Sequence, residues 1–437
     1  MQADLIIKNA MVLTMDEKLT FYEKADLAIK EEKIVDLSPQ TKFQAPKIIE
    51  AQGKLVMPGL INTHTHAAMV MMRGLADDMP LDLWWKNFIF PIEKKLLSPE
   101  FVKIGVALAA IEMIRSGTTS FSDMYFFEDA TAEICKQIGI RAFLGEGVLD
   151  FPSPDAENAE KTFKIIQALY EKWGRDPIIH LEVAPHAPYS CGPENLLKAR
   201  KLAEKLDLPL HIHVAETATE VAEIKLKYGA SPVEHLEKIG FLCERVKAVH
   251  CVHLNHRDIE ILKRRGVKVA HCPESNMKLA SGQAPVVELL DEGVVVGLGT
   301  DGAASNNNLN LFEEMDAAAK FHKAICSDPT VMDAKAVLKM ATSEAAKVVF
   351  KEKEIGSLEV GKTADLIILN LNLPHLVPLY NIYSHLVYSA GGAEVETVII
   401  NGKLIMEEKN ILTIDEAEVM DQARFLAKKI QAEVGHV

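Results

Sequence analysis

The feature that most constrains the fold is a regular alternation of short apolar segments and helical segments through the middle of the chain. The apolar segments are rich in Val, Ile, Leu and Ala, as buried parallel strands are. The segments between them, such as FVKIGVALAAIEMIRSG and PENLLKARKLAEKLD, space their apolar residues at helical intervals. The strand candidates are Leu60–Asn62, Thr118–Phe121, Ala142–Gly145, Ile178–Ala184, Leu210–Val214, Val246–His250, Val267–Ala270 and Val294–Gly299.

Eight strands separated by helices over roughly 290 residues match the length of a (β/α)₈ TIM barrel, an α/β fold. In this fold, catalytic side chains lie at the C-terminal ends of the strands. The sequence therefore predicts a catalytic barrel domain over residues 59–355, and it predicts where in that barrel the chemistry lies.

The two ends of the chain resemble each other and differ from the middle. DLIIKNAMVLTMD and ADLAIKEEKIVDLSP near the start, and TADLIILNLNL and VETVIINGKLIMEE near the end, are strand patterns broken by polar turns. Asn401-Gly402 is a strong hairpin signal. Neither end has enough strands for a stable sheet of its own. We therefore expect residues 1–58 and 356–437 to form one small β-sandwich domain, with a terminal amphipathic helix over Glu416–Val434.

Composition excludes several classes of function. The net charge is −14, and no Lys/Arg cluster interleaves with aromatic residues, which disfavours binding to a nucleic-acid polymer. No apolar run reaches the roughly 18–20 residues of a membrane span, and the start does not read as a signal peptide. The six cysteines are scattered without a C-x-x-C pair, as reduced thiols are. These patterns predict a cytoplasmic protein without a membrane partner.

Histidines gather at the ends of two strand candidates. His64 and His66 follow the first strand, and alternation along an extended chain points both imidazoles to one side. His211 and His213 end another strand, LPLHIHVAE, and spacing alone does not choose between them. A third imidazole would complete the three-histidine set typical of catalytic zinc. Taken alone, His64 and His66 favour a surface H-x-H pair without function, and the rest of the set reverses that interpretation.

Three further side chains extend this set. Glu216 lies where the strand gives way to a loop, which suits a proton shuttle as well as a helix-start carboxylate. His250 and His253 follow a third strand in VKAVHCVHL. Asp301 leaves the last strand in VVVGLGTDG, where a turn residue competes with a metal ligand or a base. Together, the four strand ends predict a metal-dependent catalytic site.

These segments resemble the amidohydrolase superfamily, and within it the branch of adenosine-type and methylthioadenosine/S-adenosylhomocysteine deaminases and related chlorohydrolases. The resemblance covers nearly the whole chain and rests on MPGLINTHTH, APHAPYSC, HIHVAET, AVHCVHL, AHCPESNMKLASG and GLGTDGAASNNNLN. It implies that His64, His66, His213 and Asp301 hold the metal, and that His211 is a neighbour of the site.

The same resemblance implies the catalytic and substrate-binding roles. Glu216 is the implied proton carrier, and His250 is expected to hold the attacking water and the developing charge, with Asp301 orienting that water. Glu93 is implied to bind ribose hydroxyls and His186 to contact the substrate. From the residues alone, Glu93 is as compatible with a solvated helix face, whereas His186 follows a buried strand in a loop stiffened by prolines.

The resemblance also bears on the metal and the reaction. Binuclear members carry a lysine at the fourth strand, and IIHLEVAPHAPYS has none, so we expect one divalent metal, Zn²⁺ or Fe²⁺. The expected reaction is hydrolytic deamination of an adenine nucleoside: methylthioadenosine, S-adenosylhomocysteine, 5′-deoxyadenosine or adenosine. Glu146 stands where methylthioadenosine/S-adenosylhomocysteine deaminases are expected to carry an arginine, which favours a neutral substrate.

Alternatives remain within and outside this class. The in-class alternative is an s-triazine or guanine-type deaminase or chlorohydrolase, and the presence of Glu93 and His186 argues mildly against it. The alternative of another class is a non-catalytic metal-binding scaffold, which the joint presence of Glu216 and Asp301 opposes. A homo-oligomer is a family-level expectation.

Overall fold

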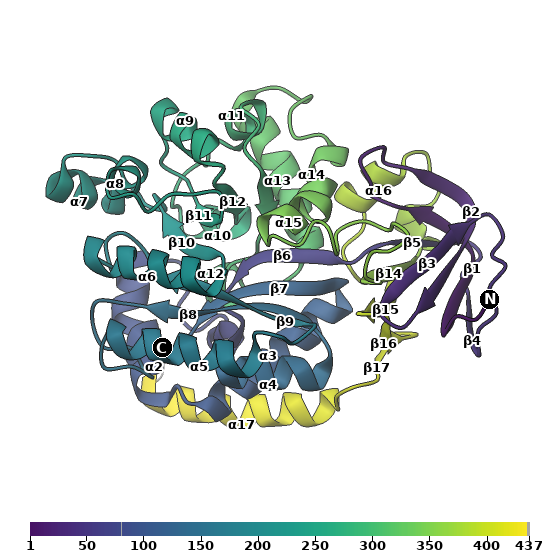
Figure 1. The fold of residues 1–437 in the computed structure, drawn as a ribbon, viewed down its shortest axis with the longest axis horizontal. Helices are drawn as coiled ribbons and strands as arrows, with labels where there is room; N and C mark the ends of the chain where they lie inside the picture. Colours follow the sequence, from purple (N-terminus) through teal and green to yellow (C-terminus); the bar gives the residue numbers. More distant parts are fainter. Residues whose placement is uncertain (80, 435–437) are drawn as a thin grey trace.

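The computed structural model describes residues 1–79 and 81–434, and within them the chain forms two sheets (Figure 1). The larger part of the molecule surrounds a parallel sheet of eight strands in sequence order, which confirms the predicted (β/α)₈ barrel in the described residues. Its strands are β6 (Leu60–Thr65), β7 (Thr118–Tyr125), β8 (Arg141–Val148), β9 (Ile179–Pro185), β10 (Leu210–Val214), β11 (Val246–His250), β12 (Lys268–His271) and β13 (Val296–Leu298).

Helices cover the outside of this sheet, because each strand is followed by an amphipathic segment that buries its apolar face against it. Caps fix where these helices begin: Ser98 accepts a hydrogen bond from the Phe101 amide, and Asn158 accepts one from the Lys161 amide. The longer helices are α3 (Pro99–Arg115), α4 (Glu128–Ile138), α5 (Ala159–Trp173), α6 (Pro193–Leu206), α7 (Ala218–Tyr228), α9 (His256–Arg265) and α13 (Leu311–Cys326). Shorter helices are η1 (Ala67–Met72), α1 (Leu81–Trp84), η2 (Trp85–Ile89), α2 (Phe90–Leu96), α8 (Pro232–Lys238), α10 (Pro273–Lys278), α11 (Val286–Asp291), α12 (Ala303–Asn306), α14 (Ala334–Met340), α15 (Ser343–Val348), η3 (Pro374–Leu376) and α16 (Ile382–Tyr388).

The first and last barrel strands meet through side chains. Asn62 Nδ2 donates to Thr300 Oγ1 at 2.7 Å, and Thr63 Oγ1 donates to the carbonyl of Leu298 at 2.8 Å. The Asp301 amide donates to the carbonyl of His64 at 3.0 Å. These bonds bring the residues that follow β13 against those that end β6.

Both chain ends contribute to the second sheet, as the sequence predicts. Its strand order in the described residues is β17-β16-β15-β14-β5-β1-β2-β3, and β4 pairs with β1. Its turn at Asn401-Gly402 has positive φ at both residues, 52° and 73°, as the hairpin signal requires. The strands are β1 (Leu5–Leu13), β2 (Phe21–Lys30), β3 (Lys33–Ser38), β4 (Lys47–Glu50), β5 (Lys54–Pro58), β14 (Leu366–Asn370), β15 (Val395–Ile400), β16 (Lys403–Glu407) and β17 (Asn410–Ile411).

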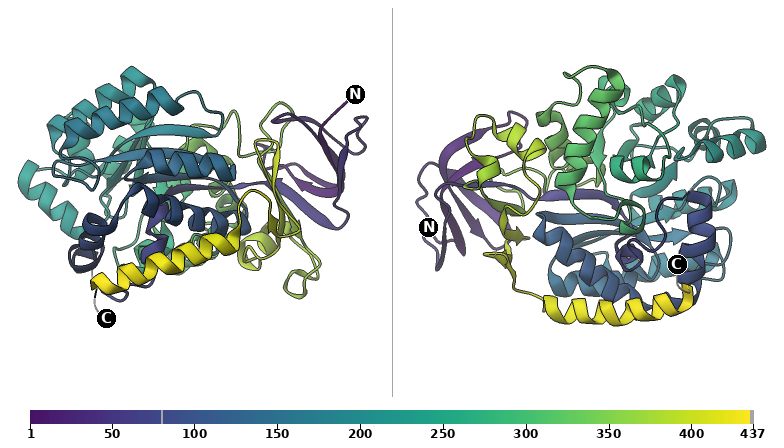
Figure 2. Two further views of the ribbon diagram at one scale, coloured as in Figure 1. Left: turned by 90° about the horizontal axis from the view of Figure 1, so that it is seen from below. Right: turned by 180° about the vertical axis from the view of Figure 1, so that it is seen from behind.

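After this sheet the chain returns to the barrel. Helix α17 (Glu416–Val434) runs along the barrel beside α3, as Figure 2 shows in yellow. The side chain of Arg115 on α3 makes two hydrogen bonds to Glu416, at 2.7 and 2.8 Å. The domain boundaries at residues 58/59 and 355/356 stay a prediction, although β5 ends at Pro58 and β6 begins at Leu60.

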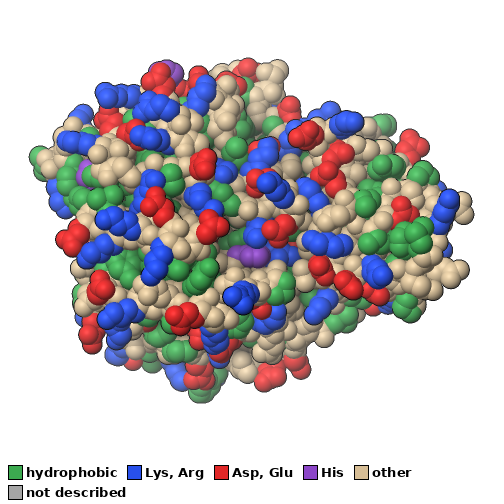
Figure 3. Space-filling model, in the orientation of Figure 1, with side chains coloured by type: hydrophobic (Ala, Val, Ile, Leu, Met, Phe, Trp, Pro, Cys, Tyr) green, Lys and Arg blue, Asp and Glu red, His purple; other side chains and the backbone are tan. Residues whose placement is uncertain are grey.

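Two further observations concern nucleic acids and membranes, the partners that the composition disfavours. On the face shown in Figure 3, acidic and basic side chains are interspersed. Among the helices of the described residues, none combines the length and the apolar composition that a bilayer crossing requires.

Candidate metal and catalytic site

A pocket of about 350 Å³ opens at the C-terminal ends of the barrel strands, where the fold places catalytic residues. Its lining includes seven of the eight candidate residues that the sequence singled out: His66, Glu93, His186, His213, Glu216, His250 and Asp301. The eighth, His64, is fully buried behind the pocket floor. The barrel therefore brings together side chains that lie up to 237 positions apart in the chain (His64 and Asp301).

Four side chains converge on the pocket floor. His64 Nε2 lies 3.2 Å from His213 Nε2 and 3.4 Å from Asp301 Oδ1, and His66 Nε2 lies 3.3 Å from the same oxygen. Ligand atoms about 2.0–2.1 Å from a tetrahedral metal are separated by roughly 3.3–3.4 Å. These three spacings match those between ligands of one small divalent cation. His64, His66 and Asp301 form one candidate metal group, and His64, His213 and His250 form a second that shares His64.

The other ring nitrogens of the three histidines are occupied by hydrogen-bond partners. His66 Nδ1 donates to the carbonyl of Met124 at 2.5 Å, and His213 Nδ1 donates to the carbonyl of His186 at 2.9 Å. His64 Nδ1 lies 2.9 Å from His211 Nε2. With the proton on Nδ1, each Nε2 lone pair faces the common point, as a metal ligand must.

Burial and charge favour the protonation states that a metal needs. Desolvation lowers the pKa of His64, His66 and His213, which keeps these imidazoles neutral. Although burial opposes the ionisation of Asp301, the neighbouring imidazoles hold the pKa of its carboxyl well below the usual range. The set is three neutral imidazoles and one carboxylate, a combination that suits Zn²⁺ or Fe²⁺.

Asp301 is fixed by hydrogen bonds to its other oxygen. Its Oδ2 accepts from Ser275 Oγ at 2.6 Å and from Ser305 Oγ at 3.0 Å. Its Oδ1 accepts from the backbone amide of Gly302 at 2.8 Å and faces His64 and His66. The two serines were not singled out by sequence reasoning. Ser275 lies within the AHCPESNMKLASG motif, which offered the signal.

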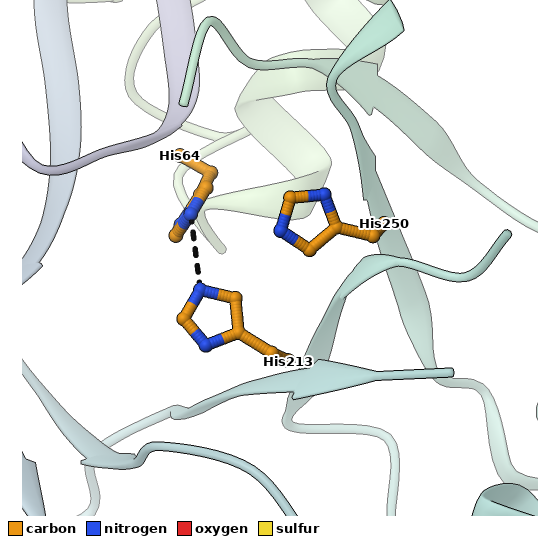
Figure 4. A group of neighbouring side chains, drawn as sticks. All are labelled: His64, His213 and His250. Carbon is orange, nitrogen blue, oxygen red and sulfur yellow. Dashed lines mark hydrogen bonds between the residues drawn. The ribbon is translucent and has the colours of Figure 1, made fainter. Parts of the chain in front are cut away.

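His250 is the fourth imidazole at the floor, and Figure 4 shows its ring beside those of His64 and His213. Its Nδ1 lies 3.1 Å from Nδ2, the side-chain amide nitrogen, of Asn276. Because an amide nitrogen only donates, Nδ1 accepts and the ring proton is on Nε2. That tautomer makes His250 a hydrogen-bond donor toward the pocket, unlike the three histidines whose Nε2 is free to bind a metal.

Glu216 lies beside this cluster, two residues after β10. One of its carboxylate oxygens is 3.8 Å from His250 Nε2. Burial, reinforced by the negative charge of Asp301, raises the pKa of Glu216 to about 8. A carboxyl with this pKa is protonated at neutral pH and can both give and take a proton.

The backbone of Glu216 is held by Glu220, in the first turn of α7. The Glu220 carboxylate accepts from the amides of Ala215 and Glu216, at 2.9 and 2.7 Å, and Thr217 caps the helix by accepting from the Glu220 amide at 3.1 Å. Glu220 thus fills the helix-start role that was the alternative reading of Glu216. The side chain of Glu216 is left to face the pocket.

The rest of the pocket is a wall of aromatic and polar side chains. Glu93 on α2 accepts a hydrogen bond from the Tyr125 hydroxyl at 2.7 Å, and burial raises its pKa to about 7. His186 Nδ1 lies 2.7 Å from Ser190 Oγ. The rings of Trp85 and Phe90 pack at a centroid distance of 4.9 Å on the same wall.

Two residues noted in the sequence lie away from the pocket lining. Glu146 is buried on β8, where it accepts hydrogen bonds from the amides of Phe127 and Glu128 at 3.1 and 3.0 Å. His253 Nε2 lies 2.6 Å from the carbonyl of Ser281. Within the part of the lining that the structure describes, Lys86 is the one lysine or arginine.

Known proteins place this geometry in a family. The sequence pattern that defines the amidohydrolase family matches residues 55–405. The chain belongs to the amidohydrolase family. The imidazoles and the carboxylate on the floor of this amidohydrolase's pocket form a donor set that suits a divalent metal.

Individual relatives narrow the comparison. This amidohydrolase is 48% identical to a 5-methylthioadenosine/S-adenosylhomocysteine deaminase of Syntrophobacter fumaroxidans, over 98% of this chain and 99% of the relative. It is 45% identical to a 5′-deoxyadenosine deaminase of Methanosarcina mazei, over 99% of both chains. A crystal structure of an adenosine deaminase from Xanthomonas campestris with bound zinc superposes with a TM-score of 0.97, at 38% identity and 99% coverage of both chains.

Proposed function

We propose that this amidohydrolase is a zinc-dependent deaminase of 5′-substituted adenine nucleosides, which it converts to the inosine analogue and ammonia. The observation that carries the proposal is the convergence of three imidazole nitrogens and the Asp301 carboxylate beside the buried Glu216 carboxyl in one pocket. Relatives named for this reaction at 45–48% identity over the whole chain support it.

His64, His66, His213 and Asp301 would hold the cation. When bound there, a divalent zinc ion lowers the pKa of water toward about 7 and so makes hydroxide available at neutral pH. Zinc is preferred to iron in this proposal because the similar crystal structure contains zinc.

The proton steps fall to two side chains. The Glu216 carboxyl donates a proton to the purine ring nitrogen next to the carbon that is attacked, which leaves a carboxylate. That carboxylate takes up the proton of the newly added hydroxyl and passes it to the leaving amine. His250 Nε2–H donates a hydrogen bond to the incoming oxygen, so that charge developing there is stabilised. Water adds to the amine-bearing carbon, the C–N bond breaks, and ammonia leaves.

The wall of the pocket binds the sugar and its 5′ group. The Glu93 carboxyl, oriented by Tyr125, accepts hydrogen bonds from ribose hydroxyls, and His186 contacts the substrate from the loop after β9. Trp85, Phe90 and Phe151 offer an apolar surface to the 5′ substituent. This surface favours methylthioadenosine or 5′-deoxyadenosine over a charged homocysteine derivative.

The proposal is tested by measuring ammonia release from methylthioadenosine, 5′-deoxyadenosine, adenosine and S-adenosylhomocysteine, with guanine and an amino-s-triazine in parallel. We expect kcat/KM for methylthioadenosine or 5′-deoxyadenosine to exceed that for S-adenosylhomocysteine. Turnover of only guanine or the triazine assigns the enzyme to the alternative substrate class. Zinc binding without turnover of any compound supports the scaffold alternative.

A variant tests the role of Glu216. Glu216→Gln keeps the size of the side chain but removes its exchangeable proton, so we expect unchanged zinc content and a loss of about 10²–10⁴-fold in kcat. Glu194→Gln, which changes an exposed glutamate outside the pocket lining, is the control and should retain activity. Normal turnover by Glu216→Gln contradicts the proton-carrier role.

A further inference from the structure

Behind the pocket floor, a row of buried polar side chains runs into the interior of the barrel. His64 Nδ1 lies 2.9 Å from His211 Nε2, and His211 Nδ1 lies 2.9 Å from Glu182 Oε2. Lys247 Nζ lies 3.1 and 2.9 Å from the two oxygens of Glu182, and Ser122 Oγ donates to Glu182 at 2.9 Å. The five side chains come from five strands of the barrel, β6, β7, β9, β10 and β11.

The row is unusual for the place it occupies. The interior of such a barrel is ordinarily filled by branched apolar side chains. His64, His211, Lys247 and Ser122 have no exposed surface, and Glu182 is 1% exposed. A buried ion pair is costly to desolvate, and apolar residues of similar volume often serve stability as well or better. Packing alone therefore gives no reason for a charged row at this position.

The hydrogen bonds in the row have a single direction. The Lys247 ammonium only donates, so the Glu182 oxygens accept. His211 then donates to Glu182 from Nδ1 and accepts at Nε2 from His64 Nδ1–H. This leaves His64 Nε2 without a proton and aimed at His213 and Asp301, 3.2 and 3.4 Å away.

We infer that Glu182, acting through His211, is a positioning residue that fixes the ring orientation and tautomer of His64 for metal binding, and that Lys247 holds Glu182 in place. The inference depends on the metal site of the proposed function and not on its substrate. It also explains why His213, and not His211, is the proposed metal ligand. Both ring nitrogens of His211 are hydrogen-bonded within this row, whereas His213 Nε2 faces the pocket floor.

The central test is Glu182→Gln. The amide keeps an oxygen for Lys247 but can turn its NH₂ toward His211, which lets His211 and then His64 take the opposite tautomer. We expect zinc affinity, measured by competition with a chromogenic chelator, to fall by about 10–100-fold. The d–d absorption of the Co²⁺-loaded protein should change as well, because the His64 ring no longer holds its orientation.

Glu128→Gln is the matched control, since Glu128 is a fully buried carboxyl outside the row that accepts from the Tyr125 amide at 3.1 Å. Its zinc affinity and Co²⁺ spectrum should match those of the unmodified protein. Zinc affinity of Glu182→Gln within two-fold of the unmodified protein, with the same Co²⁺ spectrum, overturns the inference.

A second pair of variants keeps the test usable if Glu182→Gln does not fold. His211→Gln provides an amide oxygen that can accept from His64, whereas His211→Met provides no acceptor of comparable strength. We expect zinc affinity to decrease in the order unmodified, His211→Gln, His211→Met, and equal losses in the two variants overturn the inference.

The outcomes separate this inference from the proposed function. An unmodified protein that binds zinc but deaminates no nucleoside refutes the proposed reaction, and the zinc measurements on the variants still decide the role of Glu182. An unmodified protein that binds no divalent metal overturns both.

Discussion

His250 and the three histidines proposed as ligands differ in which ring nitrogen carries the proton. The Nδ1 atoms of the three proposed ligands are hydrogen-bonded to the backbone carbonyls of Met124 and His186 and to the ring of His211. The side-chain amide of Asn276 instead donates to Nδ1 of His250. The same residue type is thus prepared as a metal ligand or as a hydrogen-bond donor by the partner of its other nitrogen.

Asn276→Asp tests this distinction. A carboxylate only accepts, so the ring proton moves to Nδ1 and His250 Nε2 loses its donor function. We expect kcat to fall by about 10²–10³-fold, the loss typical of one donor to developing charge. The measurement is kcat together with zinc content by atomic absorption, and a variant with full zinc content and unreduced kcat contradicts the assigned tautomer.

The raised pKa of Glu216 predicts a pH dependence. Burial and the charge of Asp301 shift the pKa upward to about 8, so the carboxyl is protonated below that pH and ionised above it. A group that must donate a proton loses this function as pH rises, and activity should therefore fall above about pH 8. A bound cation favours the carboxylate and moves this limb toward lower pH. The profile of kcat/KM against pH measures it, and a profile still rising at pH 9 contradicts the assignment.

At the scale of elements, the site depends on sharp turns where strands leave the barrel. His250 and Asp301 have φ of 69° and 62°, backbone values that residues other than glycine seldom adopt. The Cys251 amide donates to the carbonyl of Val214 at 3.1 Å and holds one of these turns against the neighbouring strand. Strain of this kind is typical of functional sites, where surrounding structure over-determines the backbone.

In the terminal sheet, the β15–β16 turn packs closely against the β2–β3 turn. Gly402, at φ 73° in the β15–β16 hairpin, is so close to the β2–β3 turn that an added Cβ would lie 2.0 Å from the carbonyl oxygen of Glu31. Gly53 has nearly the same φ, 76°, but open space at its Cβ position. The pair separates conformational cost from steric cost.

We expect Gly53→Ala to lower the free energy of unfolding by about 1 kcal/mol, the cost of positive φ alone. Gly402→Ala should cost about 1–3 kcal/mol more, because the two turns must move apart. Denaturant unfolding of both variants makes the comparison. Equal losses would mean that the contact with Glu31 is relieved without cost.

At the scale of the whole molecule, one buried ion pair joins the barrel to the terminal sheet. Arg141, in β8, donates from Nε to Asp365 Oδ2 at 2.7 Å, and its guanidinium also reaches the carbonyl of Pro177 at 2.8 Å. The side chains of Arg141 and Asp365 are 2% and 3% exposed. The backbone amide of Asn401 donates to the same carboxylate at 2.6 Å, which connects the hairpin turn to this ion pair.

Asp365→Asn leaves the Arg141 charge buried without its partner and should lower the free energy of unfolding by about 3–5 kcal/mol. The double variant Arg141→Met with Asp365→Leu removes both charges and should be less destabilised than Asp365→Asn. Thermal denaturation of the zinc-loaded proteins is the measurement. A double variant as unstable as the single one would show that packing, and not charge, matters at this contact.

The eight barrel strands, the Asn401-Gly402 hairpin and helix α17 could be predicted from the sequence, because each depends on periodicity and turn chemistry within a few residues. The candidate site was predictable for a related reason. Parallel strands place their C-terminal ends at one edge, so histidines and carboxylates at strand ends must gather there.

Only the tertiary structure decided the contacts that depend on strand register and on side-chain direction. Lys247 and Glu182 are charged residues within apolar strands, and nothing local shows that β11 and β9, on either side of β10, bring them 2.9 Å apart. Alternation gives His211 and His213 the same side of β10, yet their depth in the barrel separates an internal position from the pocket floor. The sequence shows which residues are neighbours along the chain. The roles of Glu182, Lys247, His211 and His213 depend instead on contacts between strands that are distant in the sequence.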